Sequence, residues 1–451
     1  MTPKKFKWTA IFLIKGAADN LRAFTQMLDQ LATTNLSPDV AVVLCINIRA
    51  EIAPTTLPLA TVLGPNDSLI RKPGWTTLFC NLESVADGNN IFNPICESRE
   101  FRMDKEEDIT VFFKQRVLSQ FAAERYILFT WDHGQPFGIF PDTNQNSVVR
   151  SPLENLHLNA FHFLQQKQLQ TERLVRAAAP VPADDALPML TATELKQAIQ
   201  WAFDGQNLDV LVMSNCFLQF FDTGYELSRC TDYLVTFETI MYFNNSFNYK
   251  NILQAMADNS AMTPETLSKI IVNDFAATFP DNAESRDEVA LFANDLSWYP
   301  ALARMIDRLA GMLTAAIPDH REKIFRAASK CGYISPGIPM FCLLDFRNLV
   351  VNFYHEMPEL IPEKFFNTLI AMMDQVVVSS FIGKEFLEAG NLPGVNPSGF
   401  SIYFPIFSED YRTSFLDNFM TESSLSPTEF IQHFGWDQFI KSYIQAEEVI
   451  V

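Results

Sequence analysis

The sequence is poor in several features that mark particular classes of protein. Its 451 residues include only 16 Gly, against 40 Phe and 48% apolar residues, which excludes collagen-like, disordered and Gly-rich low-complexity chains. The number of Cys is odd, at seven, and most of them lie in apolar runs, as Cys45, Cys80 and Cys342 do. A disulfide framework is therefore not expected, and a cytoplasmic location is favoured; secretion would require that an N-terminal signal had been removed.

Basic residues and long apolar segments are also scarce. Lys and Arg number 34 against 53 Asp and Glu, so the net charge is −19, and no long basic run offsets it. Nucleic acid is therefore not an expected partner. The first apolar block, Trp8 to Ile14, is closed by Lys15. It is far shorter than the roughly 20 residues that span a bilayer, so no membrane partner is expected. The oligomeric state stays open.

Motifs for nucleotides, serine hydrolysis and metals are missing too. No Walker loop, no GxGxxG and no GxSxG occurs. His355-Glu356 lacks the second His of HExxH, and His157 and His162 have no acidic or Cys ligand beside them. The sequence therefore predicts no metal site and no required cofactor.

The first half of the chain alternates short apolar runs with helical periodicity. This alternation is typical of a sheet built by crossover connections, and it predicts an α/β domain with a mostly parallel sheet over residues 1–250. The expected strands are Trp8–Ile14, Asp39–Ile48, Trp75–Cys80, Tyr126–Thr130 and Leu208–Met213. Two helix starts are also indicated, by the capping box of Thr191 with Glu194 and by Thr263 before Pro264.

The rest of the chain has a different character. Residues 141–190 begin polar and end in RAAAPVPADDALP, which predicts an exposed linker or insertion. Residues 251–451 are mainly helical in pattern, with a strand returning near 400–405.

Two of the expected strands end in residues that can carry chemistry. His133 and Gly134 follow the strand Tyr126–Thr130, and Cys216 follows Leu208–Met213. Sites in open parallel sheets form at the carboxyl ends of strands, so the imidazole and the thiol would converge if these strands are neighbours. The residues after Cys216 suggest a helix whose N-terminus would favour the thiolate, and the amides of Gly134 and Cys216 could bind an oxyanion. The residues alone leave a buried core Cys and a structural His equally open.

The neighbourhood of these residues resembles the clostripain-like cysteine peptidases, in the clan of caspases, legumains and gingipains. The resemblance spans nearly the whole chain. Its segments are Trp8 with Asp19-Asn20-Leu21, Trp131-Asp132-His133-Gly134, Cys216 followed by Tyr225-Glu226-Leu227 and Asp232-Tyr233-Leu234-Val235, Gly399 to Pro405, and Trp436 with Phe439 and Tyr443.

The resemblance implies a caspase-like α/β/α sandwich with a largely helical C-terminal region, and a cysteine endopeptidase. Cys216 would be the nucleophile, and His133 would protonate the leaving amine. The amides of Gly134 and Cys216 would hold the oxyanion, and protein or peptide substrates would be the partners. Calcium is bound by some relatives, but no EF-hand loop occurs here.

The chain departs from the family pattern around the specificity pocket. The family often has DAC at the nucleophile, whereas this chain has Ser214 and Asn215, and the later acidic pocket position falls at Asn244 and Asn245. We expect a neutral or apolar side chain to be accepted in place of Arg or Lys. In the alternative interpretation, Glu238 or Asp222 supplies the charge.

Two alternatives concern activity. Relatives are often self-cleaved between the His and Cys strands, so residues 141–190 are either a processing linker, with Arg150, Lys167, Arg173 and Arg176 as candidate sites, or a solvated insertion. The chain as a whole is either an active endopeptidase or a catalytically silent homologue that serves as a binding or regulatory module.

Overall fold

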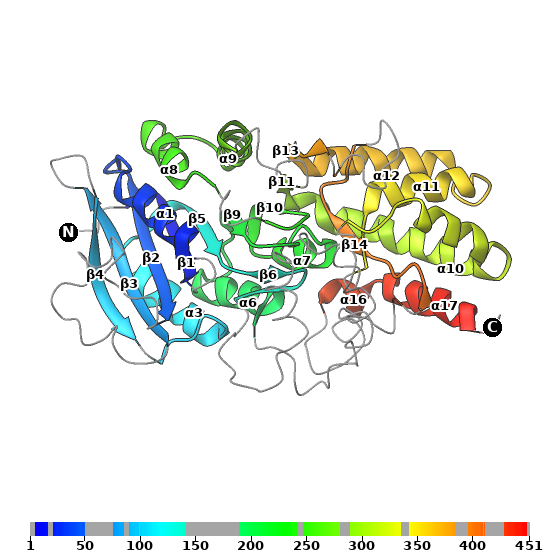
Figure 1. Ribbon diagram of the computed structural model, residues 1–451, viewed down its shortest axis with the longest axis horizontal. Helices are drawn as coiled ribbons and strands as arrows, with labels where there is room; N and C mark the ends of the chain where they lie inside the picture. The colour runs from blue at the N-terminus through cyan, green and yellow to red at the C-terminus, as the bar shows by residue number, and fades with distance from the viewer. Residues whose placement is uncertain are drawn as a thin grey trace.

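A three-layered α/β architecture forms the main body of the protein, with a group of long helices at one end (Figure 1). The computed structural model describes residues 5–16, 21–49, 75–84, 90–98, 100–140, 189–241, 247–279, 289–334, 342–384, 386, 396–408, 410 and 428–448. The linker predicted at 141–190 lies almost wholly outside these residues, as do Asn244 and Asn245.

The middle layer is a sheet of nine strands within the described residues, in the order β13-β11-β10-β9-β5-β1-β2-β3-β4. The strands β2, β1, β5, β9 and β10 pair in parallel, and antiparallel strands extend the sheet at both sides. Their bounds are β1 Phe6–Gly16, β2 Val40–Arg49, β3 Trp75–Ser84, β4 Asn90–Ser98, β5 Ala123–Trp131, β9 Leu208–Ser214, β10 Thr231–Phe237, β11 Ala290–Asp295 and β13 Val377–Ile382.

The central strands are apolar because helices cover the sheet on both faces. Residues Trp8 to Gly16 of β1 are all buried, and Phe12 stacks on Phe129 of β5 with ring centroids 4.5 Å apart. A strand buried on both sides carries a continuous apolar run rather than an alternating one, as the sequence of this strand does. Each fully buried large apolar side chain contributes about 1.5–3 kcal/mol to folding.

The covering helices form two groups on opposite faces of the sheet (Figure 1). One group is α1 Leu21–Ala32, α8 Tyr249–Asp258 and α9 Pro264–Thr278. The other is α3 Glu106–Phe112, the π-helical segment η3 Phe113–Leu118, α6 Ala192–Ala202 and α7 Phe221–Leu227. Both predicted helix starts are confirmed, because Thr191 and Glu194 form the capping box of α6 and Thr263 caps α9 ahead of Pro264.

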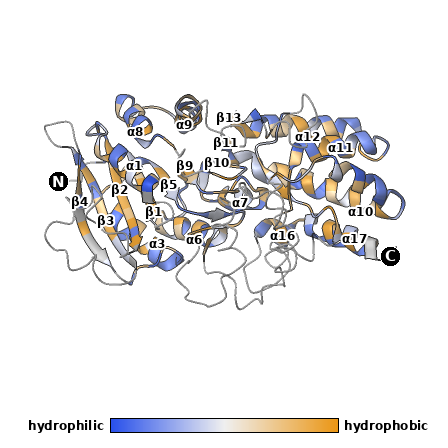
Figure 2. Cartoon of the chain, in the orientation of Figure 1, coloured by the Kyte–Doolittle hydropathy of each residue, from blue (hydrophilic) through white to orange (hydrophobic). Residues whose placement is uncertain are grey.

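The C-terminal region is largely helical, as predicted. The long helix α10 packs against α11, α12 and α17, and its buried residues Leu302, Ile306, Leu309 and Leu313 recur every three or four positions. Figure 2 shows hydrophobic and hydrophilic residues alternating around these helices, as expected of helices with one buried face. The bounds in this region are η7 Leu296–Trp298, α10 Tyr299–Ser329, α11 Phe346–Glu356, α12 Glu363–Val376, α16 Glu429–His433 and α17 Trp436–Glu448.

Strands from this region also complete the fold. The strand predicted near 400–405 is present as β14 Ser401–Tyr403, which pairs with β12 Leu343–Asp345. The sequence did not indicate that β11 and β13 join the large sheet as antiparallel strands beside β10. A small sheet of β6 Gly134–Gln135, β7 Gly138–Ile139 and β8 Leu190–Thr191 begins at the predicted site. No helix in the described part of the chain is long and apolar enough to cross a membrane.

Candidate active site

The two strands that precede His133 and Cys216 are direct neighbours in the sheet. β5 pairs with β9 in parallel, and the last pair in the register is Trp131 with Ser214. His133 and Cys216 each lie two positions beyond that pair, so both emerge from the same edge of the sheet. The condition for the expected convergence, that the two strands are neighbours, is therefore met.

Gly134 brings the two strand ends into contact. A Cβ atom on Gly134 would lie 2.6 Å from the Cβ of Asn215, and 3.3 Å from both the backbone nitrogen and the backbone oxygen of Cys216. Real side chains do not approach that closely, so this position requires glycine. The residue after His133 thus packs directly against the backbone of the proposed nucleophile.

The side chain of Asn215 joins the same two strand ends by hydrogen bonds. Thr130 Oγ1 donates to its amide oxygen at 2.6 Å, and its amide nitrogen donates to the carbonyl oxygens of Asp132 and His133 at 2.8 and 3.1 Å. Asn215 is fully buried. It was predicted to line a specificity pocket, and its contacts in this structure are with β5 and the loop that follows.

The thiol of Cys216 is enclosed. The residue is 8% exposed, and its Sγ accepts from the backbone N–H of Met241 at 3.4 Å and lies 3.7 Å from the Met241 carbonyl oxygen. Burial raises the pKa of the thiol to about 11, with a further increase from Asp132, and the hydrogen bond with the Met241 backbone lowers it only in part. In this conformation Cys216 is held as the neutral thiol.

The expectation of a helix N-terminus at Cys216 is wrong. Helix α7 begins only at Phe221, and the chain first makes a turn in which Phe217 has a φ of 60°. The segment then runs beside β10, with the N–H groups of Phe217 and Gln219 donating to the carbonyls of Thr239 and Phe237. The helical periodicity seen in the sequence belongs to α7, so the helix dipole does not favour the thiolate here.

The remaining predicted pocket residues are placed as follows. Ser214 is fully buried, and its hydroxyl shares a hydrogen bond of 2.7 Å with Tyr249. Glu238 is also fully buried, and neither of its carboxylate oxygens has a hydrogen-bond partner among the described residues. Burial, with a smaller contribution from Asp345, raises the pKa of Glu238 well above its ordinary value.

One buried residue near the site, Lys15, had no recognised role in the sequence. The ammonium of Lys15 donates to the carbonyl oxygen of Phe140 at 3.3 Å and lies 3.9 Å from Asp132 Oδ2. Lys15 ends an apolar run, so the sequence showed it only as the close of a strand. The available signal was a Lys that continues a buried strand, together with an aspartate that directly follows another buried strand.

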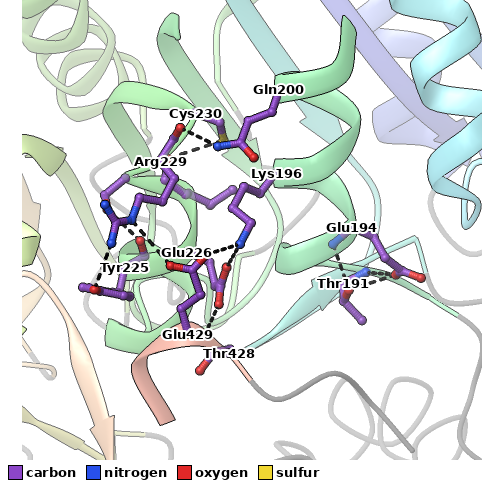
Figure 3. Close-up of polar contacts among 12 residues, drawn as sticks. Thr191, Glu194, Lys196, Gln200, Tyr225, Glu226, Arg229, Cys230, Thr428 and Glu429 are labelled. Carbon is purple, nitrogen blue, oxygen red and sulfur yellow. Dashed lines mark hydrogen bonds and ion pairs between the residues drawn. The ribbon is translucent and has the colours of Figure 1, made fainter. Parts of the chain in front are cut away.

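A separate charged cluster links α6, α7 and α16 (Figure 3). Lys196 Nζ lies 2.6 Å from Glu226 Oε2 and 2.8 Å from Glu429 Oε1, and the backbone N–H of Glu429 donates to the other oxygen of Glu226. Asp222, which the sequence offered as an alternative pocket acid, belongs to this region and accepts from Thr428 Oγ1 at 3.3 Å. Burial, followed by the nearby Glu226 and Asp437, raises the pKa of Asp222 to about 7.

No group of three or more His, Cys, Asp or Glu side chains in the described residues is arranged to hold a metal ion. The possibility of bound calcium therefore stays a prediction.

A family model decides the relationship of this chain. The model of the clostripain family, C11 peptidases, matches residues 183–443. The chain belongs to the clostripain family. It is therefore a cysteine-type peptidase, a hydrolase, as the resemblance implied. No curated protein sequence matches the chain.

Solved C11 structures have the same fold. An inactive zymogen C11 protease from Parabacteroides distasonis matches with a TM-score of 0.55 and 15% identity, covering 98% of this chain and 99% of that one. A secreted C11 protease from Bacteroides thetaiotaomicron, iotapain, matches with a TM-score of 0.58 and 13% identity, covering 97% and 100%. A secreted C11 protease of that organism in complex with an irreversible peptide inhibitor matches with a TM-score of 0.56 and 12% identity, covering 98% of this chain and 99% of that one. The predicted caspase-like α/β/α fold of this clostripain-family chain is confirmed.

Proposed function

We propose that this clostripain-family chain is an endopeptidase that uses Cys216 and His133 as a catalytic dyad. The observation that carries the proposal is the contact of Gly134 with the Cys216 backbone at the shared edge of β5 and β9. It puts a candidate nucleophile, a candidate acid–base and two candidate oxyanion donors on neighbouring backbone segments, which is the constellation that acyl transfer requires.

The proposed reaction begins with proton transfer from the Cys216 thiol to His133. The sulfur attacks the carbonyl carbon of the scissile bond, and the backbone N–H groups of Gly134 and Cys216 stabilise the negative oxygen of the tetrahedral intermediate. His133 then protonates the leaving amine, and a thioester remains on Cys216. Water, deprotonated by His133, attacks this thioester and releases the acid product.

The enclosed thiol supports the proposal that this conformation is a resting form. A thiol with a pKa of about 11 carries little thiolate at neutral pH, so Cys216 needs His133 as a base and needs space where Met241 now lies. The proposed activating event is cleavage within residues 141–190, the connection between the His and Cys strands. The relative from Parabacteroides distasonis was solved as an inactive zymogen, which is consistent with a resting form of this kind.

A neutral specificity pocket is proposed on the basis of Ser214. Its hydroxyl is satisfied by Tyr249 and carries no charge that would select a guanidinium or an ammonium. Buried Glu238 retains a raised pKa, which favours its neutral form as well. Cleavage of a peptide library only after Arg or Lys would contradict this specificity. Because the Bacteroides thetaiotaomicron relatives are secreted proteases, secretion is proposed for this chain too.

The dyad is tested by covalent labelling. A peptide with an electrophilic thiol-reactive end should modify Cys216 in the wild type, and the substitution His133→Ala should slow this modification by at least about 100-fold, since general-base assistance supplies factors of 10² to 10⁴. Cys45, Cys80, Cys230, Cys331 and Cys342 are all buried in the described part of the chain, so they serve as internal controls. Equal labelling of several Cys residues, with no effect of His133→Ala, would indicate the catalytically silent alternative.

Processing is tested by intact-mass measurement of the wild type and of the Cys216→Ala variant. Self-cleavage predicts a pair of fragments for the wild type and a single chain for the variant. A fragment pair in both, or in neither, contradicts self-processing.

A further inference from the structure

Asn215 directly precedes the proposed nucleophile, but its side chain turns away from solvent and toward the strand that carries His133. Its amide makes three hydrogen bonds, and all three partners lie between Thr130 and His133. The hydroxyl of Thr130 donates to the amide oxygen, and the amide N–H groups donate to the carbonyls of Asp132 and His133. Asn215 is 0% exposed, so bulk water does not replace these partners.

The position of these bonds matters because regular strand pairing stops just before the site. The last pair of the β5–β9 ladder is Trp131 with Ser214, and Gly134 already belongs to the small sheet with β7. The two peptide carbonyls in between, of Asp132 and His133, receive their donors from Asn215. This amide therefore continues the connection between the strands beyond the end of the ladder.

Asparagine is the residue type that fits these partners, because its amide oxygen can accept from one hydroxyl while its amide nitrogen donates to two carbonyl oxygens. An aspartate has the same shape, but its carboxylate cannot donate to two carbonyl oxygens, and alanine offers no polar atom. The reverse orientation of the amide would place its oxygen against two other oxygens, so the network assigns the orientation.

We propose that Asn215 is a positioning residue, which sets the main chain of His133 and Gly134 against Cys216. The proposal rests on the dyad function above. Asn215 holds the base of the His133 side chain and the Gly134 N–H in register with the thiol, while its own buried amide does not touch substrate. Misplacement of reacting groups by about 1 Å can cost about 100-fold in rate.

The effect is expected in the chemical step and not in substrate binding. For Asn215→Ala we expect kcat per active site to fall about 10- to 100-fold with KM changed less than about threefold. Active sites are counted by stoichiometric labelling of Cys216, so that loss of folded protein does not enter kcat. For Asn215→Asp we expect a fall in kcat and an upward shift of the acid limb of the pH profile of kcat/KM, because a second carboxylate beside Asp132 favours the protonated forms of His133 and Cys216.

A matched control is available in Asn352, another buried asparagine. It lies in α11, and its amide nitrogen donates to the Asn348 carbonyl and side-chain oxygens at 3.0 and 3.1 Å. Asn352→Ala removes a comparable amount of buried hydrogen bonding far along the chain from the dyad. It is expected to lower stability while leaving kcat per labelled site and the pH profile unchanged.

The outcomes distinguish the proposed role of Asn215 from the proposed function of the dyad. If Asn215→Ala matches Asn352→Ala, with kcat per labelled site and pH profile both as in the wild type, Asn215 is a structural residue only and the proposal is overturned. If Asn215→Ala does not fold, Thr130→Val decides, because it deletes only the donor to the amide oxygen: a reduced kcat supports positioning, and an unchanged kcat and pH profile overturn it. A wild type that neither cleaves peptides after processing nor labels at Cys216 refutes the dyad function, and the inference about Asn215 with it.

Discussion

Replacement of Lys196 by Met tests the charged cluster that joins α6, α7 and α16. The Lys196 ammonium is almost fully buried and lies 2.6 Å from Glu226, which is itself 0% exposed. Removing one member of a buried ion pair costs about 3–5 kcal/mol, because the partner charge is left without compensation in a medium that solvates it poorly. Among the described residues, Glu226 would keep only the backbone N–H of Glu429 as a hydrogen-bond partner of its carboxylate. Glu429 is 34% exposed and can be solvated, so most of the cost arises at Glu226.

The direction of the Lys196 pKa shift is consistent with a stabilising ion pair. Burial alone lowers this pKa, but the hydrogen bonds to Glu226 and Glu429 outweigh burial and raise it above its ordinary value. The stabilisation that follows from a raised pKa is fully present below the pKa of the unfolded chain. It is lost only as the pH rises through the folded-state value, above the ordinary range of lysine. The difference between wild type and Lys196→Met should therefore stay constant from pH 6 to pH 9 as far as this lysine is concerned.

The assay is urea unfolding followed by circular dichroism and by tryptophan fluorescence. Lys269→Met is the matched control, since Lys269 pairs with Glu265 at the surface of α9 and both side chains are about half exposed. Such exposed pairs are worth about 0.2–1 kcal/mol. The double variant Lys196→Met with Glu226→Gln, which removes the stranded charge, should be more stable than Lys196→Met alone. A loss for Lys196→Met no larger than that for Lys269→Met would refute the reasoning.

Three further predictions concern the site and its surroundings. Gly134→Ala should lower the free energy of unfolding by about 1–3 kcal/mol and reduce kcat at least about tenfold, because the new Cβ would lie 2.6 Å from the Cβ of Asn215. The control is Gly311→Ala in α10, where the new Cβ meets nothing within 4 Å; this variant should be more stable than the wild type by up to about 1 kcal/mol. Asp222→Asn should match the wild type in stability near pH 4 and exceed it above pH 7, because a pKa raised to about 7 makes ionisation of Asp222 cost stability as the pH rises; equal stability at pH 8 would contradict this. Iodoacetamide should modify Cys216 of the unprocessed chain ever faster up to a pH of about 11, and a rate that levels off below pH 8 would show that the thiol is not enclosed as described.

Local sequence patterns sufficed for much of the fold. The apolar run of β2 marks a strand buried on both faces, and the pairs Thr191 with Glu194 and Thr263 with Pro264 mark helix starts that the structure contains. These signals need only neighbouring residues, since periodicity and capping act within one or two turns. The position of His133 and Cys216 at the ends of apolar strands was readable for the same reason.

Contacts between distant segments were beyond the reach of such patterns. The periodicity after Cys216 suggested a helix at once, but the pairing of residues 217–219 with β10 delays α7 to Phe221 and removes the helix dipole from the thiol. Likewise, the sequences of β11 and β13 resemble those of many short apolar segments and do not indicate a partner strand. They extend the sheet because β11 pairs with the edge of β10, and β13 then pairs with β11.

Residue types and their order thus determined which segments are strands and helices, and that a thiol and an imidazole follow two of the strands. Tertiary structure alone decided that β5 and β9 are neighbours, that Met241 covers the thiol, and that Asn215 faces β5. Hydrogen-bond partners and burial set the pKa of Cys216 and the role of Asn215, and both depend on segments that meet only when the chain is folded.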